Sequence, residues 1–470
     1  MHIDLEALER SIERWKPTLD ALDPWRLLRP DEIDRLYVTR PRTPLRSLMQ
    51  ELLHGEDNTK CVLYGARGAG KTTELDRLSK VLHERFCIVS ANLGDSLPEG
   101  SGTLAIIILL GAASLSALES WLTHPDAELT ALIKADSSSW LARARSRFND
   151  ALKPLGMAAE QVAELVKAVA PLVALFEPTT AAGAAIAVGA VKAAPAISKV
   201  ASRSRELLRR DKLLGRVEPG KEDEVNAVIA AVNSILSDLR EASGRTPLII
   251  AEGLDKLSDL KSIETAVADI DYLLKFESAL ILSGPIRLSF DLQSYEIHGQ
   301  RQLSLHTLPN VPVLQVLPGE EPREGDEGVA LLLELYQLRM AQLTNPDDQD
   351  RYPEEVLRRA ARMSSGLVRD FLKLLRGAGV EAQKEGADAV TKDHMEATIR
   401  TQRQTMQRFL RDTDLDLLKQ IAQRGVLPTS ERADTLLYEN FIVCYNNGDL
   451  LYTPHMLILD YVQKYAEPDP

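Results

Sequence analysis

The segment GARGAGKT, residues 65 to 72, combines three glycines with a lysine and a threonine in the spacing GxxxxGK[ST]. Glycines allow backbone N–H groups to turn inward toward phosphate oxygens, and a helix that begins at the lysine adds the positive end of its dipole. Lys71 is then expected to reach the β- and γ-phosphate oxygens, and the Thr72 hydroxyl to hold Mg²⁺. The alternative is a glycine-rich turn without chemistry. The predicted nucleotide contacts are Gly65, Ala66, Arg67, Gly68, Ala69, Gly70, Lys71, Thr72 and Thr73.

Two carboxylates follow an apolar run in LIIAEGLDKL, residues 248 to 257. A phosphate loop of this kind needs one carboxylate to organise Mg²⁺ and another to orient the attacking water. Because Glu252 ends the apolar run, we expect it at the carboxyl edge of a parallel sheet, in the Mg²⁺ shell. Asp255 is assigned to water activation or sensing. Glu252 stands where aspartate is usual, which favours slow hydrolysis; the alternative is that both residues are solvated in a turn.

These residues require strands and helices that bring them together. The loop lies between an apolar run, KCVLYG, and a segment with helical spacing of Leu75, Leu78 and Leu82, which predicts a strand–loop–helix unit and an α/β fold with a parallel sheet. Further strands are predicted at 86–93, 246–257, 278–287 and 311–318. About 150 residues separate the second strand from the third, far more than a crossover needs, so a helical insertion is expected at about 120–220.

The remaining segments predict helices and one hairpin. Apolar residues recur at three- and four-residue spacing after residue 326, which predicts an all-helical lid, and a helical stretch followed by a hairpin at Asn446-Asn447-Gly448 suggests a winged helix. The predicted domains are an N-terminal helical segment (1–36), a core with its insertion (37–325), the lid (326–401) and a winged-helix-like domain (402–470).

Composition restricts the partners. The chain has 470 residues, a net charge of -13 and only 5% aromatic residues, so it is a poor general binder of nucleic acid. Its three cysteines form no CxxC pair, which argues against a zinc site or a disulfide framework and agrees with a reducing cytoplasm. The charged, amphipathic N-terminus is not typical of a signal peptide.

CVLYGARGAGKTTEL, LIIAEGLDKL, ALILSGPIR and SSGLVRDFLKLL occur in this order. Together they resemble the AAA+ and STAND branch of P-loop ATPases, in particular bacterial and origin-recognition-type AAA+ proteins with a winged-helix tail. The resemblance covers about 37–95 and 245–460, and leaves the insertion outside. It implies an ATPase that hydrolyses a phosphoanhydride bond, with ATP or ADP and Mg²⁺ as cofactors.

The resemblance also implies roles for single residues. The segment that starts at Tyr37 resembles the one that covers the adenine, and Ser283 occupies the position of a first sensor, with Arg287 just after it. Arg369 matches the arginine that reaches from the lid to the γ-phosphate, for which a planar guanidinium is suited. His455 resembles the histidine with which STAND proteins hold ADP. The alternatives are solvated positions for both arginines and a core position for His455.

Two apolar stretches in and near the insertion have competing interpretations. Residues 103–118 are short of a membrane span and are expected to form a buried helix. Residues 181–197, rich in small side chains, suggest a helical hairpin, and the net charge of +6 over residues 192–216 suits anionic lipid, nucleic acid or an acidic protein surface.

Three functions follow from these patterns. The first is a cytoplasmic nucleotide-driven switch in bacterial signalling or antiviral defence, which oligomerises or binds a partner protein when triggered. The second is a DNA-associated AAA+ motor or loader, disfavoured because residues 401–470 carry a net charge of -3. The third is a membrane-acting effector that uses the insertion.

Overall fold

The structure is a computed structural model, and it describes residues 5–26, 28, 30–40, 43–55, 57–123, 137–174, 202–209, 213–257, 259–289, 303–317, 319–320, 322–446 and 450–465. The chain forms two compact units. The first unit comprises Met1–Thr43, Gly65–Thr73 and Leu308–Pro470, and the second comprises Pro44–Tyr64 and Glu74–Thr307. Each unit is described by itself.

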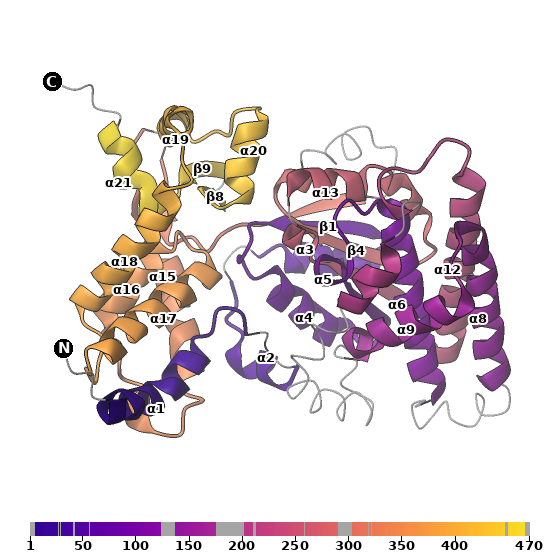
Figure 1. The fold of residues 1–470 in the computed structure, drawn as a ribbon, viewed down its shortest axis with the longest axis horizontal. Coiled ribbons are helices and arrows are strands. Elements are labelled where there is room, and N and C mark those ends of the chain that lie inside the picture. Colours follow the sequence, from indigo (N-terminus) through magenta and orange to yellow (C-terminus); the bar gives the residue numbers. More distant parts are fainter. Residues whose placement is uncertain are drawn as a thin grey trace. The chain divides into compact units, whose positions relative to one another are not determined.

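The second unit is built on a five-stranded sheet in the order β2-β3-β4-β1-β5 (Figure 1). The strands are β1 (Lys60–Gly65), β2 (Phe86–Asn92), β3 (Thr246–Glu252), β4 (Ala279–Gly284) and β5 (Leu303–Leu308). The pairings of β1 with β4, β4 with β3 and β3 with β2 are parallel. β1 and β4 are buried along their whole length, as expected for parallel strands covered on both faces. The predicted α/β fold with a parallel sheet is confirmed.

One strand was placed wrongly by the sequence pattern. Leu303–Leu308 supplies the fifth strand, whereas 311–318 contains only the short β6 (Leu314–Gln315), which pairs antiparallel with β7 (Arg323–Glu324). The sequence VPVLQVLP contains two prolines, which cannot donate to a sheet ladder. LSLHTL is less apolar because β5 is an edge strand that is only partly covered.

Helices surround the sheet in the second unit. They are α3 (Leu45–His54), α4 (Lys71–Leu82, whose first residues belong to the first unit), α5 (Leu93–Ser96), α6 (Thr103–Thr123), α8 (Ser137–Leu152), α9 (Ala159–Ala174), α12 (Glu222–Ser243) and α13 (Leu260–Val267). The described part of the predicted insertion is therefore helical. Residues 181–197 and much of the basic run at 192–216 lie outside the described residues.

By length and composition alone, the helix α6 could cross a membrane. However, 89% of its apolar 18-residue segment is buried inside the protein. It packs against α8, α9 and α12, which lie beside it in Figure 1. Gly111 allows this close packing, because a β-carbon there would lie 2.6 Å from the ring of Phe148 on α8. The prediction of a buried helix at 103–118 is confirmed.

The first unit is mostly helical. Its helices are α1 (Leu5–Ala21), α2 (Pro30–Leu36), α15 (Asp326–Met340), α16 (Glu354–Met363), α17 (Val368–Lys384), α18 (Lys392–Gln407), α19 (Asp412–Arg424), α20 (Glu431–Tyr438) and α21 (Met456–Tyr465). The helices α15 to α18 form the predicted helical lid. The strands β8 (Ile442–Asn446) and β9 (Leu450–Pro454) then form an antiparallel hairpin, whose turn at 447–449 lies outside the described residues. The predicted domain boundaries stay predictions.

The N-terminal helix α1 packs on the lid. Trp15 is fully buried, with its ring edge toward Tyr352 and the guanidinium of Arg351 4.6 Å from its ring centre. Its indole nitrogen donates a hydrogen bond to the carbonyl of Ala387. An aromatic anchor of this size explains why the segment 5–21 is folded onto α17 instead of forming an isolated helix, which would be marginal at this length.

Candidate nucleotide-binding loop

The loop between β1 and α4 has the backbone that the glycine spacing predicts. Gly68 and Gly70 adopt φ values of 83° and 98°, a left-handed region that only glycine enters without strain. The helix α4 begins at Lys71, so Thr72 and Thr73 lie in its first turn, where free N–H groups and the helix dipole favour an anion.

The side chain of Lys71 lies inside the loop. Its ammonium donates hydrogen bonds of 3.0 Å to the carbonyls of Gly65 and Ala66, and the residue is only 5% exposed. A buried ammonium is stabilised by any anion that can replace carbonyl dipoles as its partner. Strand, glycine loop, buried lysine and helix follow one another here at the end of a parallel sheet. The fold is that of a P-loop NTPase.

The carbonyls of the P-loop are held by three other segments of the first unit. The side-chain amide of Asn440 donates to the carbonyl of Arg67 at 2.9 Å, and the backbone N–H of Arg369 donates to Gly68 at 3.2 Å. The guanidinium of Arg40 donates to the carbonyl of Ala69. Arg67 also places its guanidinium over the ring of Tyr438, 5.2 Å from the centre.

The hydrogen bonds that the P-loop carbonyls accept determine which way the N–H groups of the loop point. In a trans peptide the carbonyl of one residue points away from the N–H of the next. Because the carbonyls of Arg67 and Ala69 point to Asn440 and Arg40, the N–H groups of Gly68 and Gly70 point away from these partners. Backbone N–H groups on the inner side of such a loop can form a nest for phosphate oxygens. The chain therefore fits a nucleotide phosphate at the predicted position.

Arg369 lies at the start of α17, the lid helix that contacts the P-loop. Its guanidinium stacks on Trp25, 4.5 Å from the ring centre, and the ammonium of Lys373 lies 5.6 Å from the same ring. Trp25 is 64% exposed. The structure thus brings Arg369 to the P-loop through its backbone, whereas its predicted side-chain contact with the γ-phosphate stays a prediction.

Tyr37 lies in the extended segment after α2, and Arg40 of this segment reaches the P-loop. The contact of Tyr37 with adenine stays a prediction.

His455 is buried beside the lid helix. Its Nδ1 accepts a hydrogen bond from the N–H of Leu457, which leaves the proton on Nε2, 3.7 Å from the carboxylate of Asp370. Burial alone would raise the pKa of Asp370, but the nearby His455 ring and the charge of Lys373 hold it below its usual value. His455 therefore contacts the residue next to Arg369; its predicted role in holding ADP stays a prediction.

The predicted carboxylates lie in the second unit. Glu252 is the last residue of β3 and is 5% exposed, and Asp255, in the short 3-10 helix Leu254–Lys256, is 8% exposed. Asp76, on α4, lies near Glu252: burial and the charge of Glu252 raise its pKa, and Lys256 acts in the opposite direction.

The Oδ1 atom of Asp76 is buried and accepts no hydrogen bond from the part of the chain that the structure describes. The carboxylates of Glu252 and Asp76 repel each other, and one oxygen of Asp76 is covered and lacks a donor. This arrangement fits a hard divalent cation such as Mg²⁺, because a cation relieves both the repulsion and the missing bond. The assignments of Glu252 and Thr72 to Mg²⁺, and of Asp255 to water, stay predictions.

Ser283 and Arg287 also lie in the second unit. Ser283 is buried near the end of β4, opposite Leu63 of β1, and Arg287 follows three residues after the strand ends. Their roles as sensors stay predictions.

Sequence reasoning missed four residues of these sites: Arg40, Asp76, Trp25 and Asn440. One signal was available for Asn440, since an asparagine just after a predicted helix is typical of a left-handed helix end. The structure confirms this conformation, with φ at 64°.

No protein-family model matches the chain, and neither does any curated protein sequence. Among solved structures, the Orc1 protein of Aeropyrum pernix in complex with DNA is similar at 14% identity and a TM-score of 0.39, covering 93% of this chain and 96% of that one. Cdc6p from Pyrobaculum aerophilum has 11% identity and a TM-score of 0.37, covering 95% and 96%. Drosophila ORC bound to DNA has 11% identity and a TM-score of 0.30, covering 93% and 90%. Likenesses this weak carry no argument about function.

Proposed function

We propose that the protein is an AAA+-type ATPase that binds ATP at the P-loop, hydrolyses it slowly and acts as a nucleotide-dependent switch. The observation that carries this proposal is the set of hydrogen bonds from Asn440, Arg369 and Arg40 to three successive P-loop carbonyls. The loop is thereby attached to the C-terminal hairpin domain (α19, α20, β8, β9 and α21), the lid and the N-terminal segment. A nucleotide that moves the loop changes all three contacts, and such differential contacts are what a switch requires.

In this proposal, different residues bind the phosphates, hold the cation and orient the water. Bound Mg²⁺–ATP supplies the phosphoanhydride bond, which breaks as water adds to the γ-phosphorus and ADP leaves with the bridging oxygen. Lys71 exchanges the carbonyls of Gly65 and Ala66 for phosphate oxygens, so that its buried charge acquires an ionic partner. Glu252 and Asp76 would hold the cation, and Asp255 would orient the attacking water.

The binding step is tested with a nonhydrolysable ATP analogue and calorimetry. Lys71→Ala should lower the affinity at least tenfold, because the charge-assisted contact with the phosphates is lost. Lys80→Ala, on the same helix but outside the loop, is the matched control and should bind like the wild type. Unchanged affinity of Lys71→Ala would exclude the P-loop as the nucleotide site.

The switching step is tested by native mass measurement without nucleotide, with ADP and with the ATP analogue. We expect the mass or the hydrogen-exchange protection of 431–446 to differ between ADP and the analogue. Identical behaviour in both states would leave an ATP-binding protein but would refute the switch. A role in bacterial signalling or antiviral defence belongs to this proposal through the resemblance of the motifs.

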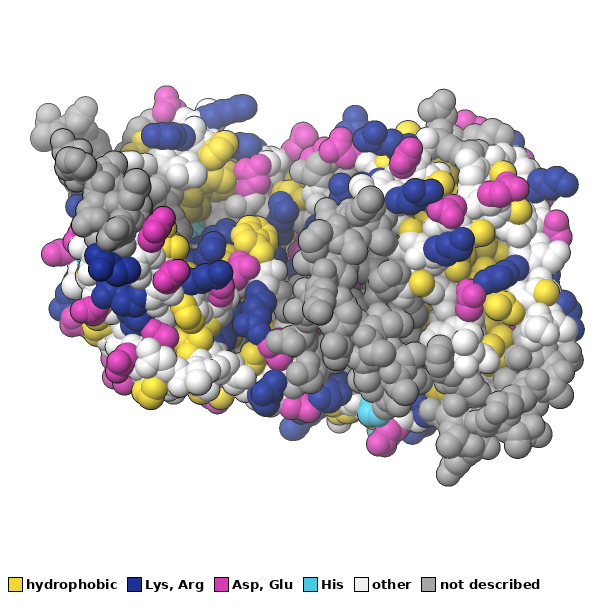
Figure 2. All heavy atoms as spheres, turned by 60° about the horizontal axis from the view of Figure 1, so that its bottom comes forward, with side chains coloured by type: hydrophobic (Ala, Val, Ile, Leu, Met, Phe, Trp, Pro, Cys, Tyr) yellow, Lys and Arg dark blue, Asp and Glu magenta, His cyan; other side chains and the backbone are white. Residues whose placement is uncertain are grey.

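A DNA-associated ATPase is the competing proposal. The charge distribution opposes it: Lys and Arg side chains are interspersed with Asp and Glu over the face shown in Figure 2, and residues 401–470 carry a net charge of -3. Binding to a DNA duplex at about 50 mM salt that weakens 10³-fold or more by about 200 mM would favour this alternative. Absence of binding at the lower salt would remove it.

A further inference from the structure

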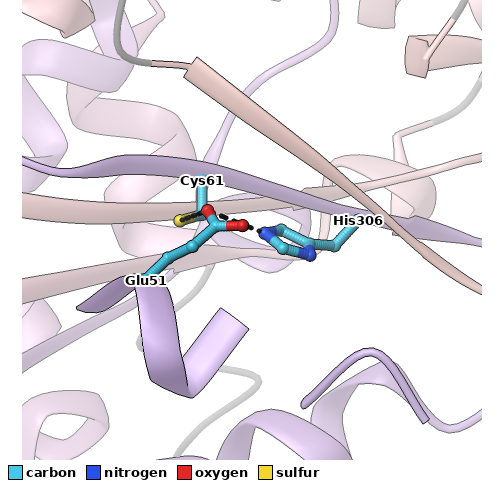
Figure 3. Close-up of side chains that lie close together, drawn as sticks. All are labelled: Glu51, Cys61 and His306. Carbon is cyan, nitrogen blue, oxygen red and sulfur yellow. Dashed lines mark hydrogen bonds and ion pairs between the residues drawn. The ribbon is translucent and has the colours of Figure 1, made fainter. Parts of the chain in front are cut away.

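Three metal-ligating side chains meet in the second unit, away from the P-loop. Glu51 lies on α3, Cys61 on β1 and His306 on β5, and one ligand atom of each lies within 4.8 Å of the other two. Figure 3 shows the Glu51 carboxylate between the Cys61 sulfur and the His306 ring. Cys61 and His306 are buried, at 1% and 7% exposure, whereas the Glu51 side chain is 37% exposed and gives access from solvent.

A fourth residue sets the tautomer of the histidine. The Ser47 hydroxyl donates to the carbonyl of Pro44 at 2.9 Å, so toward the His306 Nδ1 atom, 3.4 Å away, it acts as acceptor. The ring proton is therefore on Nδ1, and the lone pair of Nε2 points at Glu51 Oε2, 3.3 Å away. Two lone pairs at this distance repel each other unless a proton or a metal ion lies between them. A histidine that donates its other nitrogen to a fixed acceptor is the usual arrangement of a metal ligand.

The distances between the ligand atoms match a tetrahedral ion. A Zn²⁺ ion bound at about 2.3 Å to sulfur and about 2.1 Å to nitrogen and oxygen sets nitrogen and oxygen about 3.4 Å apart and sulfur and oxygen about 3.6 Å apart. The corresponding separations here are 3.3 Å between His306 Nε2 and Glu51 Oε2, and 3.8 Å between Cys61 Sγ and the same oxygen. Two of the three separations thus match those of a tetrahedral ion, and the third, between the sulfur and the ring nitrogen, is within 4.8 Å.

We propose that Glu51, Cys61 and His306 form a binding site for a divalent transition-metal ion, and that thiolate, imidazole and carboxylate together select Zn²⁺. The fourth position is left to water, which reaches the site past Glu51. The ion would join α3 and the edge strand β5 to β1, the strand that leads into the P-loop, and so would act as a structural staple.

Without the ion the same residues form a weaker arrangement. Burial and the Glu51 carboxylate raise the pKa of the Cys61 thiol, which donates a long hydrogen bond of 3.8 Å to Glu51 Oε2. Binding of the cation displaces this proton to solvent and replaces a poor hydrogen bond with a metal–thiolate bond. The two states are distinguishable by experiment.

The first test is the metal content of the full-length protein, followed by removal of the metal and titration with Co²⁺. We expect one equivalent of Zn²⁺ per chain and, with Co²⁺, a thiolate-to-cobalt charge-transfer band. Cys61→Ser should abolish the band, whereas Cys87→Ser, an equally buried cysteine on β2, should keep it. Wild-type protein that binds neither ion, or an unchanged band in Cys61→Ser, would overturn the proposal.

The second test does not remove a ligand and so preserves the fold. Ser47→Ala removes the acceptor of the Nδ1 proton, and we expect the affinity for Co²⁺ to fall about 10- to 100-fold. Thr59→Ala, on the loop that precedes β1, controls for loss of a nearby hydroxyl outside the cluster. Equal affinities of the Ser47→Ala variant and the wild type would overturn Nε2 as the ligand atom.

Discussion

Asn440 holds the carbonyl of Arg67 at 2.9 Å from a left-handed backbone position, at φ 64°. The two residues are 373 positions apart in the chain. A non-glycine residue in this conformation is uncommon, and asparagine is among the side chains that tolerate it. The contact connects the end of α20 to the middle of the P-loop, so it links the C-terminal hairpin domain directly to this loop.

Two substitutions at Asn440 distinguish the effect of losing the hydrogen bond from the effect of backbone strain at this position. Asn440→Ala loses the amide and puts a β-carbon without compensation at φ 64°, which should cost about 1–2 kcal/mol of unfolding free energy. Asn440→Gly loses the same amide without the strain and should cost less. Urea denaturation measures stability, and titration with a fluorescent ATP analogue measures binding. If the amide matters to the switch, both variants shift nucleotide affinity alike; wild-type affinity in both would make the contact purely structural.

Gly68 tests how closely the lid approaches the P-loop. Gly68→Ala places a β-carbon 2.7 Å from the β-carbon of Arg369 and adds strain at φ 83°, so ATP affinity should fall at least tenfold and stability by more than about 1 kcal/mol. Gly244→Ala is the matched control, because its φ of 65° carries similar strain but no described atom lies within 4 Å of the added carbon. The control should lose stability and keep binding; equal binding losses in both would contradict a specific contact.

We expect the carboxylate of Asp76 to lower the stability of the metal-free protein at neutral pH and to favour cation binding. Its pKa is raised in the folded protein, so the stability it contributes is present at low pH and is lost as pH rises above 3.8, its ordinary value. Asp76→Asn should therefore stabilise the metal-free protein at pH 7 but not at pH 3.5, and should raise the Mg²⁺ concentration that half-maximal ATP hydrolysis requires. Denaturation at both pH values and a Mg²⁺ titration measure these effects. A variant that loses stability at pH 7 would refute the repulsion with Glu252.

The pKa of Asp370 is shifted in the opposite direction from that of Asp76. Its pKa is lowered by His455 and Lys373 despite its burial, so its contribution to stability is full above its ordinary pKa of 3.8 and is lost only below it. Asp370→Asn should cost about 1–3 kcal/mol, and the difference from wild type should stay constant from pH 7 down to about pH 4. Chemical denaturation across this range measures it. A difference that disappears between pH 7 and 5 would contradict the lowered pKa of Asp370.

The sequence could predict the P-loop because local chemistry determines it. Gly68 and Gly70 take positive φ values that other residues avoid, and the apolar run before Glu252 identifies a covered strand and its end. The edge strand β5 was missed for the converse reason. His306 interrupts its apolar pattern, and the structure shows that this histidine is buried against Glu51 and Ser47, a polar contact that periodicity cannot reveal.

The partners of the P-loop could not be predicted from the sequence. Arg40 and Asn440 belong to segments whose own patterns say only that they follow a helix, and their contacts depend on how distant helices pack. Asp76 lies on α4 among residues with ordinary helical spacing. Only the packing that covers its Oδ1 atom and brings it near Glu252 makes its carboxylate unusual.

The burial of α6 has a consequence for synthesis of the protein. The helix is covered by α8, α9 and α12, all of which follow it in the chain. A ribosome therefore releases a 21-residue apolar helix well before its cover, which is complete only when Glu222–Ser243 has emerged. During that interval the nascent chain exposes a surface that membranes and other unfinished chains can bind, so chaperones that shield apolar segments should matter more for its yield than for its final stability.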